Sequence, residues 1–262
     1  MNNTYIEKRN NILKNWGLEE GSSMKDAENL NIIIDSMRES QIKLNQRNVS
    51  KICRLYRGHL VDVKNIHQIS DYNIVLSNAK LSSWTKSLSS AALYSSPNGY
   101  QGSGHNKIPF VFHTKYNFNE KLGLDLECLP NYNYYPDERK INMTGDTCEC
   151  YHEPSVLDKD REVILYSSNF ILNTNTLKLA FMNVFEEEIH LSFSSNRILQ
   201  GIEDGSLFKN ESWFRFLGFK SLIFYPQQLP EIKEKLFNIG YTEDMIANLH
   251  IYIRCTVDVA NV

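Results

Sequence analysis

The spacing of apolar residues changes at about residue 50, and this change limits the folds that the chain can adopt. Between residues 24 and 37, apolar side chains recur three and four positions apart, as on one face of an amphipathic helix. An earlier helix is expected at residues 5–16, and Ser22 or Ser23 is the expected N-cap of the second helix. The apolar positions of the second helix are Ala27, Leu30, Ile33, Ile34 and Met37.

Beyond residue 50 the chain consists of short apolar runs separated by polar, glycine-bearing segments. Such runs predict β-strands. Helices followed by many short strands predict the α+β class rather than a doubly wound parallel sheet. The expected strands are 52–56, 74–77, 108–113, 161–166, 170–172 and 250–257, and a further helix is expected at 230–237.

The length of 262 residues fits one large domain, or one domain with an appended module. Hydrophobic residues make up 42% of the chain, which is enough to build a sizeable core. We expect a principal domain at 1–175, with helices in 1–50 and a core of strands in 50–175. The pattern shifts again after residue 175, and 176–262 either completes this domain or forms a small accessory module.

Charge and cysteine usage weigh against several classes of protein. The formal net charge is −3, so no global positive field attracts the chain to nucleic acid. Five scattered cysteines are typical of a reducing compartment. The Cys-Glu-Cys-Tyr-His sequence at 148–152 lacks the second cysteine pair of a zinc site, and no metal is expected. With no signal-like N-terminus and no apolar span of about 20 residues, we expect a cytoplasmic protein without membrane contact.

Three short motifs carry the chemistry, and the first is Tyr56-Arg57-Gly58 at the end of an expected strand. A guanidinium at this place can bind a pyrophosphate through two hydrogen bonds. The glycine that follows would let a ligand approach the backbone. An ordinary surface arginine is the alternative for so short a motif.

The second motif is Leu81-Ser82-Ser83-Trp84-Thr85. A hydroxyl on a strand can donate to a carboxylate and hold its orientation, and Ser83 is the candidate for this role. A solvated polar strand, or a helix cap before residues 90–94, is the alternative interpretation.

The third motif is Asp160-Arg161-Glu162-Val163-Ile164-Leu165, in which a glutamate opens an apolar run. The run predicts a buried strand, and a charge at its start can point into a cleft. A glutamate that shields a strand edge is the alternative. Asp160 lies on the same side as Glu162 if the strand begins that early.

In this order, the three motifs resemble the ADP-ribosyltransferases of the arginine–serine–glutamate class, and the string Arg-Glu-Val-Ile-Leu is the strongest match. The resemblance covers residues 50–175. It implies an α+β fold of two small, roughly perpendicular sheets with an N-terminal helical layer. It also implies that NAD is the co-substrate and lies in the cleft between the sheets.

The resemblance implies a cofactor-binding set. Arg57 would bind the phosphates or the nicotinamide-side ribose of NAD, and the backbone of Gly58 and His59 would contact the carboxamide. The further members of this set are Ser83, Trp84, Thr85 and Tyr100.

The resemblance also implies a catalytic set of Ser83, Glu162 and Asp160. Ser83 would orient Glu162, which would accept from the ribose 2′-hydroxyl as nicotinamide leaves. The residue two before the glutamate bears on the acceptor in this family, as glutamate for arginine acceptors and glutamine for other side chains or guanine bases. Asp160 matches neither, so the acceptor stays open. Tyr100 is expected to stack on nicotinamide or the acceptor, unless its loop is simply solvated.

The expected function is mono-ADP-ribosyl transfer from NAD to a macromolecular acceptor, either a protein side chain or an RNA or DNA base. By analogy with small members of the family, we expect an intracellular toxin or host-modifying factor, in a toxin–antitoxin or phage-defence setting, with an inhibitory antitoxin as a further partner. Two alternatives remain open. One is an NAD glycohydrolase, in which water replaces the acceptor, and the other is a catalytically silent binding module.

Overall fold

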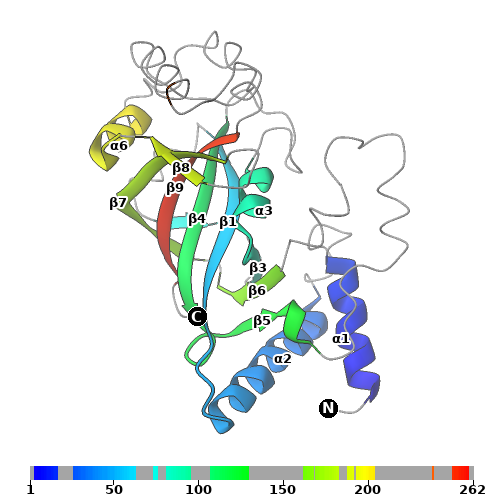
Figure 1. Ribbon diagram of the computed structural model, residues 1–262. Coiled ribbons are helices and arrows are strands. Elements are labelled where there is room, and N and C mark those ends of the chain that lie inside the picture. Colours follow the sequence, from blue (N-terminus) through cyan, green and yellow to red (C-terminus); the bar gives the residue numbers. More distant parts are fainter. Residues whose placement is uncertain are drawn as a thin grey trace.

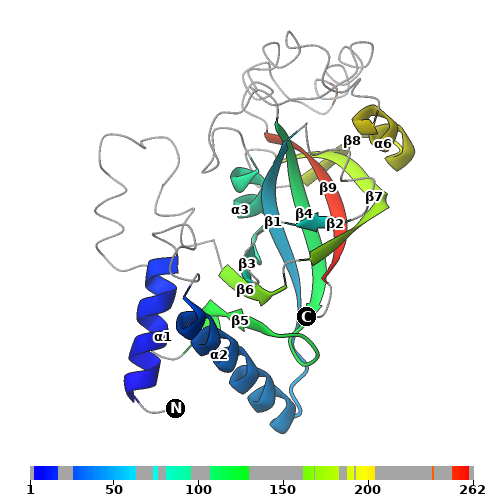
Figure 2. The same ribbon diagram turned by 180° about the vertical axis from the view of Figure 1, so that it is seen from behind.

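The protein combines helices with one extensive β-sheet, as seen in a computed structural model (Figures 1 and 2). The class is therefore mixed α and β, as the α+β prediction requires. The structure describes residues 3–16, 26–62, 73–75, 81–95, 107–129, 162–167, 169–182, 188–191, 193–203, 238 and 250–259.

The helices of the N-terminal region are close to their expected positions. The N-cap of the second helix is Asp26, whose carboxylate accepts a hydrogen bond from the Glu28 backbone N–H at 2.8 Å. Ser22 and Ser23, which were expected in that role, lie outside the described residues. The described helices are α1 (Asn3–Trp16), α2 (Ala27–Gln46), α3 (Leu88–Tyr94), α6 (Ser195–Glu203) and the 3₁₀ turn η3 (Leu126–Cys128).

Among the described residues, nine strands form one sheet with the order β2-β7-β9-β4-β1-β3-β6-β5, and β8 pairs with β7 outside this path. Every pairing is antiparallel except that of β4 with β9. The strands are β1 (Ile52–Asp62), β2 (Asn73–Val75), β3 (Leu81–Thr85), β4 (Lys107–Asn117), β5 (Gly123–Asp125), β6 (Glu162–Tyr166), β7 (Asn169–Met182), β8 (Glu188–Leu191) and β9 (His250–Val259).

The sheet consists of a large half, β2-β7-β9-β4-β1, and a small half, β3-β6-β5, and strand pairing joins the two at one place. β1 pairs with β4 along its whole length, but its register with β3 consists of the single pair Tyr56↔Thr85. Figure 1 shows β1, β4, β9 and β7 running side by side, while β5 and β6 run across the lower end of this group. The resemblance implied two small, roughly perpendicular sheets; in the described residues the strands form one sheet, in which the only register that joins the small half, β3-β6-β5, to the large half is the single β1–β3 pair.

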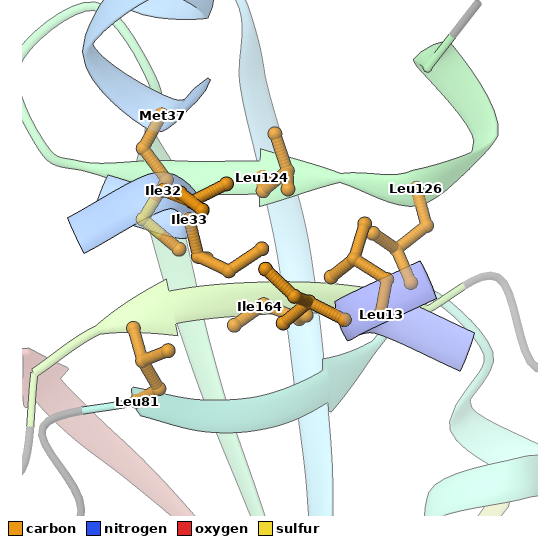
Figure 3. Packing of buried hydrophobic residues seen from close by; sticks show 9 residues of the cluster. Leu13, Ile32, Ile33, Met37, Leu81, Leu124, Leu126 and Ile164 are labelled. Atoms are coloured by element: carbon orange, nitrogen blue, oxygen red, sulfur yellow. The ribbon is translucent and has the colours of Figure 1, made fainter. Parts of the chain in front are cut away.

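The N-terminal helices cover the small half-sheet. Their apolar faces and the side chains of β3, β5 and β6 form one buried cluster (Figure 3). Burial of such side chains supplies most of the stability of an amphipathic helix, because isolated helices of this length are marginal in water. The buried members are Ile12, Leu13, Ile32, Ile33, Met37, Leu81, Leu124, Leu126 and Ile164.

The C-terminal region contributes to the same sheet. β7 extends across residue 175, and its register with β9 shifts between Asn173 and Lys178, as at a β-bulge. β9 lies between β7 and β4 and pairs with both. The helix expected at 230–237 lies outside the described residues. None of the helices in the described part of the chain has the length and hydrophobicity that a membrane crossing requires.

Candidate active site

Ser83 and Glu162 meet across the small half-sheet. β3 and β6 are antiparallel neighbours, with Ser83 opposite Ile164 and Glu162 opposite Thr85. The two side chains are thus diagonal neighbours, a spacing that polar side chains can bridge. Ser83 Oγ donates to Glu162 Oε1 at 2.5 Å. The structure therefore brings together two residues that are 79 positions apart in the chain.

Arg57 reaches the same place from the large half-sheet. It follows Tyr56, the β1 residue at the junction with β3, and its Nη1 donates to the backbone carbonyl of Ser83 at 2.5 Å. The Nε atom of Arg57 is buried and has no hydrogen-bond partner among the described residues. Arg57, Ser83 and Glu162, one residue from each of the three motifs, therefore lie together at the junction of the two half-sheets.

Burial perturbs both charged groups of this trio. It lowers the pKa of Arg57 to about 10, against an opposing effect of the Glu162 carboxylate, so the guanidinium stays charged at neutral pH. Burial also raises the pKa of Glu162, while the Ser83 hydrogen bond and the charge of Arg57 act in the other direction. A carboxylate with a raised pKa beside a cation is typical of functional sites, although ion pairs in stable cores show it too.

The lack of a side chain at Gly58 allows α3 to pack closely on β1. The reason expected from the sequence was different, namely that this glycine would let a ligand approach the backbone. A Cβ at Gly58 would lie 2.0 Å from the backbone oxygen of Ala91 and 2.6 Å from the backbone nitrogen of Ser95. The space above Gly58 is therefore filled by the backbone of α3, not kept open for a ligand. A contact of its own backbone with NAD, which the resemblance implies, stays a prediction.

The side chains of Trp84 and Thr85 pack and form hydrogen bonds within the protein. The Trp84 indole is fully buried, lies 5.3 Å from the Phe170 ring between centroids, and donates from Nε1 to Ser82 Oγ at 2.9 Å. The Thr85 hydroxyl accepts from the Ser87 backbone N–H at 2.9 Å. Any cofactor contact of Trp84 would therefore have to come from its backbone, and its place in the cofactor-binding set stays a prediction.

His59 occupies the β1 position two residues after Arg57 and so lies on the same face of the strand. Its ring is partly exposed and lies 6.3 Å from that of Phe112, between centroids. Tyr100 and Asp160 lie outside the described residues, as do the loops at 96–106 and 130–161 that contain them. The structure therefore places neither the expected stacking residue nor the expected acceptor residue.

Sequence reasoning missed a second polar cluster beside this site. Asp125 on β5 contacts Lys51 and Lys86, which lie just before β1 and just after β3. The three residues come from separate segments and form no local motif, so only strand pairing could have revealed their proximity. Within the described residues, no group of three or more histidine, cysteine, aspartate or glutamate side chains is arranged to hold a metal ion.

Comparisons of the chain with models of known protein families, with curated proteins and with solved structures give no match. The grounds for assigning a function are therefore the three motifs and their geometry. This geometry joins a cation, a hydroxyl and a partly buried carboxylate at one point of the sheet. Such a set can bind an anionic group and, close by, stabilise a developing positive charge.

Proposed function

We propose that this protein is a mono-ADP-ribosyltransferase that uses NAD as co-substrate and Glu162 as its catalytic carboxylate. The observation that carries the proposal is the 2.5 Å hydrogen bond from Ser83 Oγ to Glu162 Oε1, with Arg57 bound to the carbonyl of the same serine. The order of the motifs along the chain and this contact support the same assignment independently.

The groups at the site suit a dinucleotide with a pyrophosphate. The buried Nε–H of Arg57 has no acceptor among the described residues, although buried donors are nearly always paired in native proteins. An anionic oxygen would supply the missing acceptor, and a guanidinium binds pyrophosphate more specifically than an ammonium does. Arg57 would therefore hold the phosphates, with Gly58 and His59 beside it.

The chemical role of Glu162 follows from its fixed orientation. Bound NAD would supply a ribose bonded to a positively charged nicotinamide ring. When the bond between the ring nitrogen and the sugar breaks, nicotinamide would leave as a neutral molecule and the positive charge would pass to the sugar. Ser83 holds the carboxylate in place through its hydroxyl. The Glu162 carboxylate would then accept a hydrogen bond from a ribose hydroxyl and stabilise the positive charge that grows on the sugar. Because the Ser83 hydroxyl already holds the Glu162 carboxylate, these side chains would need to move little during the reaction.

The proposed acceptor is a macromolecule, either a protein side chain or a nucleic-acid base. Asp160, two residues before Glu162, is the proposed acceptor-side residue. In keeping with the resemblance, the proposed setting is that of an intracellular, cytoplasmic toxin or host-modifying factor that a specific antitoxin neutralises.

The fate of labelled NAD tests this proposal. Purified protein is incubated with cell lysate and NAD labelled in its adenylate phosphate. We expect label in acid-insoluble material that protease or nuclease releases, from the unaltered protein and from the control Glu120→Gln, which changes an exposed turn residue. We expect none from Glu162→Gln.

Three other results would contradict the proposal, each in a different way. Free ADP-ribose without labelled macromolecules would identify an NAD glycohydrolase instead. Equal labelling by Glu162→Gln would remove Glu162 from its proposed role. No consumption of NAD by the unaltered protein would favour the silent binding module.

A further inference from the structure

Asp125 is a buried carboxylate that binds two lysines. Its side chain is 4% exposed, and its Oδ2 atom lies 2.5 Å from Lys51 Nζ and 2.6 Å from Lys86 Nζ. The Cys128 thiol also donates to this oxygen, at 3.4 Å. The two ammonium groups hold the pKa of Asp125 below its ordinary value, although burial alone would raise it.

The two lysines belong to different halves of the sheet. Lys51 directly precedes β1, which lies in the large half, and Lys86 directly follows β3, which lies in the small half. Asp125 itself lies on β5, at the outer edge of the small half. The register of β1 with β3 is the single pair Tyr56↔Thr85, so the contact of Asp125 with Lys51 adds to the few links between the halves, which include the hydrogen bond from Arg57 to the Ser83 carbonyl.

This link lies next to the candidate active site. Asp125 is opposite Val163 on β6, and Val163 is opposite Trp84 on β3. The residues that precede these two partners are Glu162 and Ser83. A shift of β3 or β6 against β1 would therefore move the Ser83–Glu162 pair relative to Arg57.

Stability alone is a weak reason for such an arrangement. A buried ion pair is often no more stabilising than apolar residues of similar volume, because both charges lose their hydration. Moreover, the Oδ1 atom of Asp125 is buried and has no hydrogen-bond partner among the described residues, which adds to this cost. What the cluster does provide is a defined distance between β1 and the end of β3.

We propose that Asp125 is a positioning residue that, through Lys51 and Lys86, sets the placement of Arg57 against the Ser83–Glu162 pair. The inference rests on the proposed cleavage of NAD at that site. Asp125 touches no reacting atom in this scheme. It acts by fixing the junction of the half-sheets.

Steady-state kinetics of nicotinamide release test the proposal with three variants. Asp125→Asn removes the charge that binds both lysines. Lys51→Gln breaks the Asp125 contact to the β1 side and leaves that with Lys86, and it also removes the Lys51 Nζ contact with Cys128 Sγ. Glu127→Gln is the control, because Glu127 is a partner of Lys86 at 2.7 Å but is an exposed residue of the η3 turn. We expect kcat to fall roughly tenfold to a hundredfold in the first two, with a smaller change in KM, and little change in the control.

The pH profile separates positioning from a general loss of structure. If Arg57 moves away from Glu162, the carboxylate loses part of the effect that lowers its pKa. The acid limb of kcat/KM should therefore move to higher pH in Asp125→Asn and Lys51→Gln. Unfolding of part of the sample would lower the rate without moving this limb. An unchanged limb, or an equal fall in kcat for Glu127→Gln, would overturn the proposal.

Hydrogen exchange gives a readout that needs no activity. In Asp125→Asn and Lys51→Gln, the amides of β3 should exchange faster while those of β4 and β9 stay protected. If the unaltered protein released no nicotinamide, the proposed function would fail, and exchange would still decide whether Asp125 joins the half-sheets. Unchanged β3 exchange in both variants would exclude this link. Lys51→Gln decides the matter if Asp125→Asn does not fold.

Discussion

At the scale of single residues, Glu162 should make the reaction sensitive to acid. Burial raises the pKa of its carboxylate above the ordinary 4.5, and the protonated form neither accepts a hydrogen bond well nor stabilises a cation. We predict that kcat/KM for nicotinamide release falls as the pH drops through a value above 4.5.

Ser83→Ala provides the matching test of the hydrogen bond. The Ser83 hydroxyl lowers the pKa of Glu162, so its loss should move the acid limb of kcat/KM to higher pH. The measurement is the pH–rate profile of both proteins. An acid limb at the same pH in both would show that the hydrogen bond does not tune this carboxylate.

Gly58 makes a prediction about stability that is independent of any function. A methyl group at this position would meet backbone atoms of α3, which cannot rotate away as a side chain can. We predict that Gly58→Ala lowers the free energy of unfolding by about 2 kcal/mol or more, as measured by urea denaturation.

Gly123→Ala is the control for this substitution. The three atoms nearest its added Cβ would be side-chain atoms, of Phe118 and Tyr116 at 3.0 Å and of Leu165 at 3.2 Å. These atoms can shift by a few tenths of an ångström, so a smaller loss is expected. A loss at Gly58 no greater than that at Gly123 would mean that α3 is not held tightly on β1.

At the scale of elements, the N-terminal helices should depend on their apolar faces. Ile33 lies on the buried face of α2 and is fully buried, whereas Ile42 on the same helix is 54% exposed. We predict that Ile33→Ala costs about 2–5 kcal/mol of unfolding free energy and that Ile42→Ala costs less than about 0.5 kcal/mol. Thermal or urea unfolding measures both, and similar losses would contradict the packing shown in Figure 3.

The sequence predicted elements well where the apolar period was long. The helical spacing of 24–37 predicted α2, and the start of β1 at residue 52 was also correct. β7 was predicted as only three residues, because the polar run Asn173-Thr174-Asn175-Thr176 is typical of a turn. In the structure this run lies within the strand, at its register shift. β5 and β8 are too short for any periodicity to show.

The same limits apply to the candidate site. Arg57, Ser83 and Glu162 could be named because each belongs to a short motif. Arg57 was expected at the end of its strand, but it lies within β1, which continues to Asp62. Trp84 has the same local setting, and only strand packing shows that its indole faces the core. Asp125, Lys51 and Lys86 meet through the pairing of β5, β6, β3 and β1, and no local pattern contains that information.

At the scale of the whole molecule, the candidate site lies at the junction of the two half-sheets. The large half supplies Arg57, and the small half supplies Ser83 and Glu162. A small shift of one half against the other would therefore change the distance between Arg57 and the Ser83–Glu162 pair. The helical layer and the Asp125 cluster both restrain the small half, from its face and from its edge.

The large half-sheet should make the folded protein sensitive to mild acid. Burial and the charges of Arg254, Arg54 and Lys178 lower the pKa of His113 from 6.5 to about 4, although its hydrogen bond to the Cys255 carbonyl opposes them. Between these values the unfolded chain binds more protons than the folded one, so stability falls as pH decreases from about 6.5 to about 4.

His113→Gln should flatten this dependence. The measurement is the free energy of unfolding in urea at several pH values across the interval. Some slope will remain in the variant, because the pKa of His190 is lowered as well. An undiminished slope in His113→Gln would show that His113 is not held neutral in the fold.

Release of nicotinamide from NAD by the purified protein is the most direct test of what the Arg57–Ser83–Glu162 site does. Glu162→Gln keeps the size of the side chain and removes its charge, and Glu120→Gln controls for the loss of one carboxylate at the surface. We predict release by the unaltered protein and by Glu120→Gln, and a rate at least roughly a hundredfold lower for Glu162→Gln. No release by the unaltered protein, or equal release by Glu162→Gln, would contradict the proposed function.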